Sequence, residues 1–408
     1  MQPRHVIPQV RPVSRIVVCL SMKTKGMQPG TTTLSASARH LATSVTATEE
    51  DDTAQKLACI WQQQLGVAAV DLKQNFFDLG GDSSLAVRMF AEIEKVFGVK
   101  LPLATLYEAP TVEELARILR GEVASSGCSA LVSIQPSGSR PPFFCMHGAG
   151  GTVLMYRELS RHLGDDQPFY GLQSLGLDGS CAPLTSIEEM GSVYLKEIRK
   201  AQPRGPYFIG GYCMGGTVAF EVAQQLQREG ETIALLAMFD TMNWHKIPLT
   251  IRSKTSHASQ RVVFHASSFL SLDSRGKVRF FREKVGALRS RIPVWRGKLL
   301  ARFNKGVRGE VSDSLLLAQI WQQNDRASWN YIPKPFPGVV TDIRPAKQYR
   351  VFSKPDLKWE RLTEGHEIVV LPVNPASMLV EPFVEHLAAA LRQSIDAAAQ
   401  RFNVDSSR

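Results

Sequence analysis

The segment that most constrains the fold is an apolar run ending in closely spaced glycines, YFIGGYCMGG at residues 207–216. The apolar residues predict a buried strand and the residues after Cys213 predict a helix, so the chain must reverse within a tight turn. Gly211 and Gly215 flank Cys213, where such a turn leaves no room for side chains. Cys213 is therefore expected at a helix N-terminus, where the helix dipole favours a thiolate. A glycine-rich turn with a buried cysteine is the alternative.

Strand-like and helix-like stretches alternate from Leu131 onward. Helices are expected between the strands, including one capped by Ser186 with Glu189. This alternation predicts an α/β fold with a mostly parallel sheet and helices on both faces. Residues from about 245 to 330 interrupt the alternation with a long helical insertion. The predicted strands are residues 143–146, 169–172, 207–210, 234–239, 339–343 and 368–371.

The preceding part of the chain predicts a separate, small all-α bundle. Helical spacing of apolar residues predicts helices over 53–65 and from Ser83, and a last helix begins at Thr111, which forms a capping box with Glu114. The chain is therefore expected to be multidomain. The expected order is a disordered tail over 1–50, a helical domain over 51–122, a linker over 123–130, an α/β domain over 131–398 and a tail over 399–408.

Ser83 follows the turn Gly80-Gly81 in the segment NFFDLGGDSSL. As the N-cap of a helix it would expose its hydroxyl beside the positive end of the helix dipole. A phosphodiester at this position is electrostatically favoured. A capping serine with no further role is the plain alternative.

Two other segments suit acyl chemistry. The run FFCMHGAGG at 143–151 predicts a strand and then a loop that can point a backbone N–H at a developing oxyanion. Asp240 ends a predicted strand 27 residues after Cys213. This placement fits the nucleophile, acid, histidine order of α/β-hydrolases, although an aspartate at a strand end is also a common turn former.

Residues 51–122 resemble peptidyl and acyl carrier domains. The resemblance rests on LGGDS at 79–83, on the preceding phenylalanines and on LYEAPTVEELA at 106–116. It implies a four-helix fold with 4′-phosphopantetheine attached to Ser83, and Ser84 is the neighbouring alternative. It also implies a phosphopantetheinyl transferase and upstream synthetase or synthase modules as partners.

The rest of the chain resembles the thioesterase domains that end nonribosomal peptide and polyketide synthases. The resemblance covers about 265 residues, including PYFIGGYCMGG and SMLVEPFVEHLAAAL. It implies an α/β-hydrolase fold with a helical lid at about 245–330, and release of an acyl or peptidyl thioester. By this resemblance Cys213 accepts the acyl group, Asp240 is the acid, and Ala149 and Met214 supply oxyanion-hole N–H groups.

The chain departs from that family at the expected catalytic histidine. The segment PVNPASML at 372–379 resembles the family pattern PGNHxSML, but Pro375 occupies the histidine position and has no ionisable group. His245 and His366 are the candidate replacements, and His147 is a weaker one. Alternatively, Cys213 works without a base, which would favour acyl transfer to an amine over hydrolysis. A third possibility is a non-catalytic partner of the carrier domain.

The net charge of +10 is unevenly distributed. Residues 1–48 carry six basic and no acidic side chains, whereas residues 246–308 carry 16 basic and two acidic ones. From Glu49 onward the chain carries 42 basic and 38 acidic side chains, so this part as a whole is only mildly basic and a nucleic-acid partner has little support. Because residues 71–82 are acidic, we expect salt-sensitive docking of the carrier domain on the basic insertion, with a solvated basic surface as the alternative.

The six cysteines are scattered and show no zinc-ligand spacing, so no metal is expected. A reduced, cytoplasmic compartment fits them. No apolar run is long enough to predict a membrane span.

Overall fold

The structure is a computed structural model, and it divides the chain into two compact units. One unit comprises Met1–Leu101 and Glu108–Ser125, and the other comprises Pro102–Tyr107 and Ser126–Arg408. The residues that the structure describes are 16–17, 49–81, 83–123, 129–177, 181–243, 313–348 and 359–405, with isolated positions between 260 and 277.

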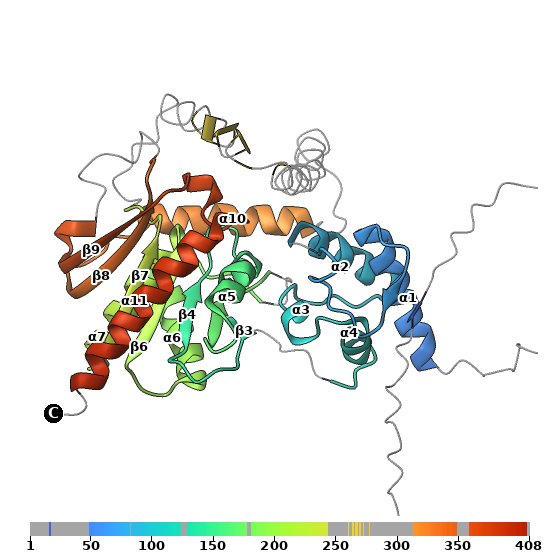
Figure 1. The fold of residues 1–408 in the computed structure, drawn as a ribbon. Coiled ribbons are helices and arrows are strands. Elements are labelled where there is room, and N and C mark those ends of the chain that lie inside the picture. Colours follow the sequence, from blue (N-terminus) through green and yellow to red (C-terminus); the bar gives the residue numbers. More distant parts are fainter. Residues whose placement is uncertain are drawn as a thin grey trace, which may run out of the picture. The chain divides into compact units, whose positions relative to one another are not determined.

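The first unit confirms the predicted helical bundle (Figure 1). Its helix α1 packs against α2 and α4, and a short helix α3 lies between the last two in sequence. The capping box at Thr111 is formed: the Glu114 N–H donates to the Thr111 hydroxyl, and the Thr111 N–H donates to the Glu114 carboxylate. The helices of this unit are α1 (Glu49–Leu65), α2 (Ser83–Phe97) and α4 (Val112–Leu119), whereas α3 (Thr105–Glu108) consists mostly of residues that belong to the second unit.

Aromatic side chains fill the centre of this bundle. Trp61 and Phe76 are fully buried and meet edge to face, with ring centroids 5.3 Å apart. Phe76 and Phe77 also meet edge to face, with the same spacing between their ring centroids. These phenylalanines precede the glycine turn, so the core fixes the backbone that leads to α2.

Two described parts of the chain fall within the expected N-terminal tail over 1–50, namely the first two residues of α1 and a short strand. Strand β1 (Ile16–Val17) pairs antiparallel with β2 (Val70–Asp71). Ile16 lies opposite Asp71 and Val17 lies opposite Val70. The expectation of a wholly disordered tail is therefore wrong at these two residues, because a pairing partner more than fifty positions away leaves no local periodicity to detect.

The second unit is built on a seven-stranded sheet (Figure 1). The strand order is β3-β5-β4-β6-β7-β8-β9, and every neighbouring pair is parallel except β3 with β5. The predicted mostly parallel sheet is therefore confirmed. The strands are β3 (Leu131–Gln135), β4 (Phe143–Met146), β5 (Phe169–Leu172), β6 (Tyr207–Tyr212), β7 (Ile233–Phe239), β8 (Phe336–Pro345) and β9 (Thr363–Leu371).

Helices cover both faces of this sheet. Helices α6 and α7 pack on one face, and α5 and α11 on the other. Helix α10 comes from the expected insertion, most of which lies outside the described residues. The helices are α5 (Arg157–Leu163), α6 (Ile187–Ala201), α7 (Met214–Arg228), α10 (Asp313–Asn330) and α11 (Val384–Asp405), with short 3-10 helices η2 (Leu154–Tyr156), η6 (Trp359–Arg361) and η7 (Pro375–Ser377).

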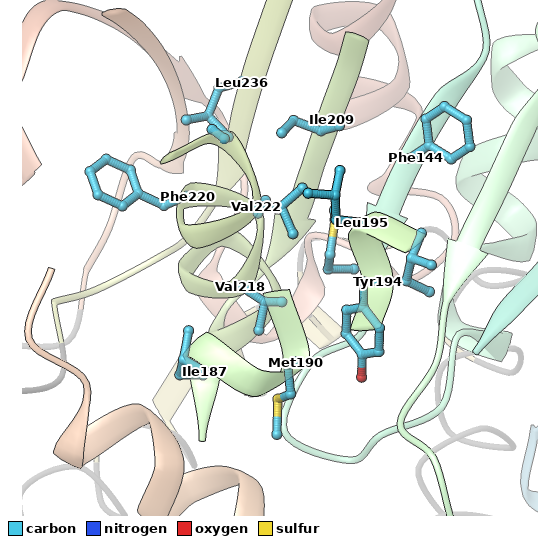
Figure 2. Close-up of a cluster of buried hydrophobic side chains, with 14 of the residues drawn as sticks. Phe144, Ile187, Met190, Tyr194, Leu195, Ile209, Val218, Phe220, Val222 and Leu236 are labelled. Carbon is cyan, nitrogen blue, oxygen red and sulfur yellow. The ribbon is translucent and has the colours of Figure 1, made fainter. Parts of the chain in front are cut away.

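Alternation along the strands divides the core into two layers. In β4 all four side chains are fully buried, with Phe144 in the cluster under α6 and α7 and Phe143 in the cluster under α11. Figure 2 shows the first cluster, in which Phe144, Ile209 and Leu236 of three strands meet Val218 and other residues of the covering helices. A strand buried on both faces reads as a continuous apolar run, which is why these strands were predictable.

The described cysteines occur both as free thiols and in disulfides. Among the described cysteines, Cys145 and Cys213 are free, whereas Cys59 and Cys181 are disulfide-bonded. The scattered spacing of the cysteines did not predict these bonds, and they contradict the expectation of a fully reduced chain.

None of the described helices combines the length and apolar character needed to cross a bilayer.

Candidate active site and carrier site

Cys213 stands between β6 and α7 in a strained backbone conformation. Its φ of 56° and ψ of −117° lie in a region that side-chain-bearing residues rarely adopt. A Cβ on Gly211 would overlap the backbone of Gly215, and a Cβ on Gly215 would overlap the Met146 carbonyl oxygen. The predicted strand, turn and helix are therefore present, and both glycines are required by close backbone approach.

Hydrogen bonds hold this turn in place. The Cys213 N–H donates to the Phe239 carbonyl at 2.9 Å. The buried hydroxyl of Tyr156 donates to the Met146 carbonyl at 2.6 Å and accepts from the Tyr212 N–H at 3.0 Å. Tyr156 thus ties the end of β4 to the residue before Cys213, so the turn and the loop after β4 are fixed relative to each other.

The Cys213 thiol is not activated by its surroundings. Burial, and then the negative charge of Asp240, raise its pKa to about 12; the Met214 N–H lowers the pKa, and the charge of Asp325 adds the smallest contribution, an increase. The thiol is therefore protonated at neutral pH. This differs from the expectation that the helix N-terminus would increase the thiolate fraction, because desolvation outweighs the dipole.

Asp240 follows the last residue of β7. Its N–H donates to the Ile343 carbonyl at 3.0 Å, and its φ is 44°. Burial, followed by the charge of Asp342 on the adjacent strand, raises the pKa of Asp240 to about 7. A carboxyl with such a pKa exists in both protonation states near neutral pH and can exchange protons.

The loop after β4 lies against this turn. A Cβ on Gly148 would be 3.6 Å from the Tyr212 carbonyl oxygen. The Ala149 carbonyl accepts a hydrogen bond of 3.0 Å from the Asn324 side chain, so α10 reaches this loop. Met214 is buried at the start of α7. The loop and the helix start that carry the two expected oxyanion-hole donors are therefore brought together.

His147 has a structural role. It is fully buried, and its two ring nitrogens lie 2.7 Å from the Gly148 carbonyl oxygen and 2.6 Å from the Tyr194 hydroxyl. Burial lowers its pKa to about 4, so the ring is neutral. Both nitrogens are engaged, which leaves none to serve Cys213.

His366 lies far from the turn. Strand register aligns Tyr212 with Phe239, then Ile343, then Val369, and His366 is three residues before Val369. Strand spacing and rise place its backbone about 17 Å from that of Tyr212. Its Nε2 instead lies 3.4 Å from the Asp342 carboxylate. The structure therefore does not bring His366 to Cys213, because two strands of the sheet, β7 and β8, lie between β6 and β9.

The segment aligned with the family's histidine does lie beside the turn. Pro375 is buried, and its carbonyl accepts a hydrogen bond of 3.3 Å from the Tyr212 hydroxyl. The other candidate base, His245, lies outside the described residues, as does most of the basic stretch 246–308. Within the described part of the chain, no histidine hydrogen-bonds to Cys213 or Asp240.

The carrier motif sits at the start of α2. Ser83 is the first residue of that helix, and the side chains of Ser83 and Ser84 lie outside the described residues. The Gly81 N–H donates to the Phe76 carbonyl at 3.0 Å, and a Cβ on Gly81 would overlap the Phe76 ring. The buried ring therefore requires a glycine there and sets the path of the chain towards Ser83. Ser83 begins a helix of 15 residues, and the N-terminus of such a helix favours the negative charge of a phosphodiester.

A further cluster of ionisable side chains involves neither Cys213 nor Ser83. Glu158, His162 and Glu381 bring three possible metal-ligating atoms within 4.8 Å of one another. Arg161 lies 2.8 Å from the Glu158 carboxylate and 2.9 Å from that of Glu381. Because the arginine neutralises both carboxylates, we assign no metal to this group.

Two family models match this chain. The family model "Phosphopantetheine attachment site" matches residues 55–119, and the model "Thioesterase domain" matches residues 141–289. The chain therefore contains a carrier domain of the phosphopantetheine-attachment family followed by a thioesterase domain of the α/β-hydrolase type. A domain of the first kind implies a covalently attached phosphopantetheine.

Similar proteins include large synthetases. The chain is 44% identical over 187 residues to malpinin synthetase of Mortierella alpina, covering 45% of this chain and 2% of that protein. It is 38% identical over 193 residues to a dimodular nonribosomal peptide synthase of Bacillus subtilis (strain 168), covering 47% of this chain and 8% of that protein. The chain thus spans only a small part of these relatives.

One solved structure matches nearly the whole chain. It is a holo four-domain nonribosomal peptide synthetase bound to AMP and glycine, with 25% identity and a TM-score of 0.53. The match covers 91% of this chain and 27% of that one. The two domains of this chain therefore have their counterparts among nonribosomal peptide synthetases.

Sequence reasoning missed three polar residues around the site, of which Asp342 acts on Asp240 and the other two belong to α10. Asp342 lies in the middle of β8, where an acidic residue within a buried strand is a readable signal. Asn324 and Asp325 lie within the expected insertion, where only the contacts of α10 show which side chains approach the site.

Proposed function

We propose that the chain carries an acyl or peptidyl group as a thioester on Ser83 and releases it through Cys213. The observation that carries this proposal is the positive-φ conformation of Cys213 between β6 and α7, with Asp240 at the end of the adjacent strand. Strain of this kind persists where the surrounding structure enforces it, and it is concentrated at functional sites. The start of α7 gives the acyl group a position beside backbone N–H groups.

The first domain, which we place at 51–122, would present the substrate. Phosphopantetheine supplies a flexible arm ending in a thiol. The start of α2 favours its phosphate through the helix dipole, and Ser83 is the attachment residue that best fits the motif, with Ser84 as the alternative. Upstream synthetase or synthase modules would load the carrier, and a phosphopantetheinyl transferase would modify it.

Acylation exchanges one thioester for another. The bond between the carbonyl carbon and the substrate sulfur breaks, the bond to Cys213 Sγ forms, and the thiol proton passes to the departing thiolate. Since the pKa of Cys213 is about 12, a proton acceptor is needed. Asp240, with a pKa of about 7, takes that proton and returns it to the leaving sulfur. The Ala149 and Met214 N–H groups would stabilise the oxyanion.

Release depends on the molecule that attacks the acyl group on Cys213. Water gives the free acid and is the leading product route for a thioesterase domain. An amine is the second candidate, because Pro375 replaces the usual histidine and an amine nucleophile depends less on a general base than water does. A non-catalytic role as a carrier partner remains the competing proposal, and it predicts no acylation at all.

Intact-protein mass spectrometry tests the proposal. A Ser83→Ala chain, which has no pantetheine thiol, is incubated with a short acyl-pantetheine thioester. We expect one acyl group to be added, and none to be added when Cys213→Ala is also present. Cys145→Ala is the matched control, because Cys145 is a free but fully buried cysteine. Equal labelling of the Cys213→Ala chain would overturn the proposal.

A further inference from the structure

Helix α10 covers the loop that carries Ala149. Asn324 is fully buried and donates to the Ala149 carbonyl at 3.0 Å. A Cβ on Gly150 would lie 3.4 Å from the Trp321 ring, and one on Gly151 would lie 3.1 Å from Ile320. Three consecutive loop residues therefore touch one face of α10, so the helix is packed on the loop along a full turn.

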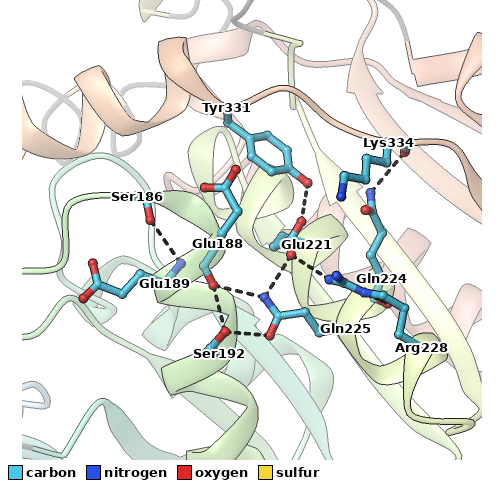
Figure 3. Close-up of polar contacts among 10 residues, drawn as sticks. All are labelled: Ser186, Glu188, Glu189, Ser192, Glu221, Gln224, Gln225, Arg228, Tyr331 and Lys334. Carbon is cyan, nitrogen blue, oxygen red and sulfur yellow. Dashed lines mark hydrogen bonds and ion pairs between the residues drawn. The ribbon is translucent and has the colours of Figure 1, made fainter.

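The C-terminal end of α10 is fastened to α7, the helix that begins after Cys213. Tyr331, the residue after α10, donates its hydroxyl to the buried Glu221 carboxylate at 2.7 Å (Figure 3). The Gln224 side chain donates to the Lys334 carbonyl at 3.1 Å. Helix α10 is thus held at its middle by the loop and at its end by α7, which fixes the position of its side chains.

Asp325 lies next to Asn324 on this helix. Its carboxylate accepts a hydrogen bond from Trp321, one turn earlier. The residue is half-buried, and burial raises the pKa of its carboxyl. The Trp321 ring in turn lies against the loop beside Cys213, because a Cβ on Gly150 would be 3.4 Å from that ring. Cys213 therefore has two carboxyls in its surroundings, Asp240 from the sheet and Asp325 from the helix over the oxyanion loop.

The two carboxyls are suited to different protons. Asp240 is held to the sheet by its N–H bond to Ile343 and belongs to the same layer as Cys213. Asp325 is carried by the helix that lies over the loop beside Cys213, and both aspartates are half-buried. The two carboxyls therefore come from different elements, one from the sheet and one from the covering helix, so each can serve a different step.

We propose that Asp325 is the catalytic residue that takes the proton of the acceptor molecule during release of the acyl group from Cys213. This inference rests on the proposed function and supplies a base for its second step. The acceptor's oxygen or nitrogen bonds to the carbonyl carbon while its proton moves to the Asp325 carboxylate. The bond between that carbon and Cys213 Sγ then breaks, and the proton passes from Asp325 to the departing thiolate.

The test separates formation of the acyl group on Cys213 from its removal. Ser83→Ala chains are mixed with the acyl-pantetheine thioester, then freed of it, and the adduct is followed by mass. We expect Asp325→Asn to acylate at nearly the wild-type rate and to lose the acyl group about 10²-fold more slowly or worse. Asp325→Glu should restore part of the rate. Arg326→Gln is the control, because Arg326 is the exposed neighbour on α10.

A second variant guards against a folding defect. Asp325→Ala should recover faster decay when formate is added, because a small carboxylate can occupy the vacated place. Adduct decay at the wild-type rate in Asp325→Asn, with Cys213→Ala still unlabelled, overturns the inference and leaves the proposed function standing. Decay that is slow in Asp325→Ala and does not respond to formate also overturns it. Absence of any adduct in the wild type removes the proposed function as well.

Discussion

Replacing Tyr331 with Phe tests whether α10 is anchored as described. The Tyr331 hydroxyl lies 2.7 Å from Glu221 Oε2, whereas the side chains of Gln225 and Arg228 contact Oε1 at 2.9 and 3.1 Å (Figure 3). Tyr331→Phe therefore leaves Oε2 of a buried carboxylate without its partner among the described residues. A hydrogen bond to a charged group is worth about 1.5–3 kcal/mol.

The local geometry places the loss at the lower end of that range. A cavity of about 430 Å³ borders both Glu221 and Tyr331, so water can reach the freed oxygen. We expect a loss of about 1.5–2 kcal/mol in the free energy of unfolding of the thioesterase unit. For a domain of this size the melting temperature would fall by roughly 3–8 °C.

Calorimetry of the whole chain measures this, because the two units can be followed as separate transitions. Tyr170→Phe is the matched control: Tyr170 is half-buried in β5, and its hydroxyl has no hydrogen bond among the residues described. Substitutions that remove no buried contact usually change the free energy of unfolding by no more than about 0.5 kcal/mol. If Tyr331→Phe costs no more than Tyr170→Phe, the anchoring of α10 to α7 is not as we describe it.

The other predictions concern the turn, the acid and the carrier serine. Because burial holds the pKa of Asp240 near 7, above its unfolded value, the folded chain binds the extra proton and stability falls as pH rises from about 4 to 7. Asp240→Asn should therefore raise the free energy of unfolding at pH 8 while changing it little at pH 4, as urea titrations would show. Gly215→Ala forces a Cβ into a backbone carbonyl and should cost about 1–3 kcal/mol, more than Gly148→Ala, where the nearest atom would lie at an ordinary contact distance of 3.6 Å, and a smaller urea midpoint shift would contradict this. Ser83→Ala should abolish the mass gain from coenzyme A and a phosphopantetheinyl transferase, whereas Ser84→Ala should keep it.

The sequence was most informative where one local rule decides the structure. The central strands are buried on both faces, so each appears as an apolar run, and the glycines around Cys213 mark a turn that excludes side chains. Thr111 and Ser186 mark helix starts through their own hydrogen bonds. These features depend on residues a few positions apart, which a single sequence displays.

The features that were missed depend on distant partners. Strand β3 has one buried residue, Val132, and forms the sheet edge, so its apolar pattern is weak. His366 looked suitable until strand register placed it three strands from Cys213. The raised pKa of Cys213 and the approach of Asp325 follow from burial and helix packing, which no spacing in the sequence encodes.

The most direct measurement follows one acyl group from the carrier to the turn. Holo chain is loaded with an acyl group, sampled over time and digested, and the acyl label is quantified on the peptides that contain Ser83 and Cys213. We predict that label leaves the Ser83 peptide, accumulates on the Cys213 peptide and then disappears, and that Cys213→Ala holds it on Ser83. Product release at an equal rate from the Cys213→Ala chain, with no label ever on residue 213, would contradict the central claim.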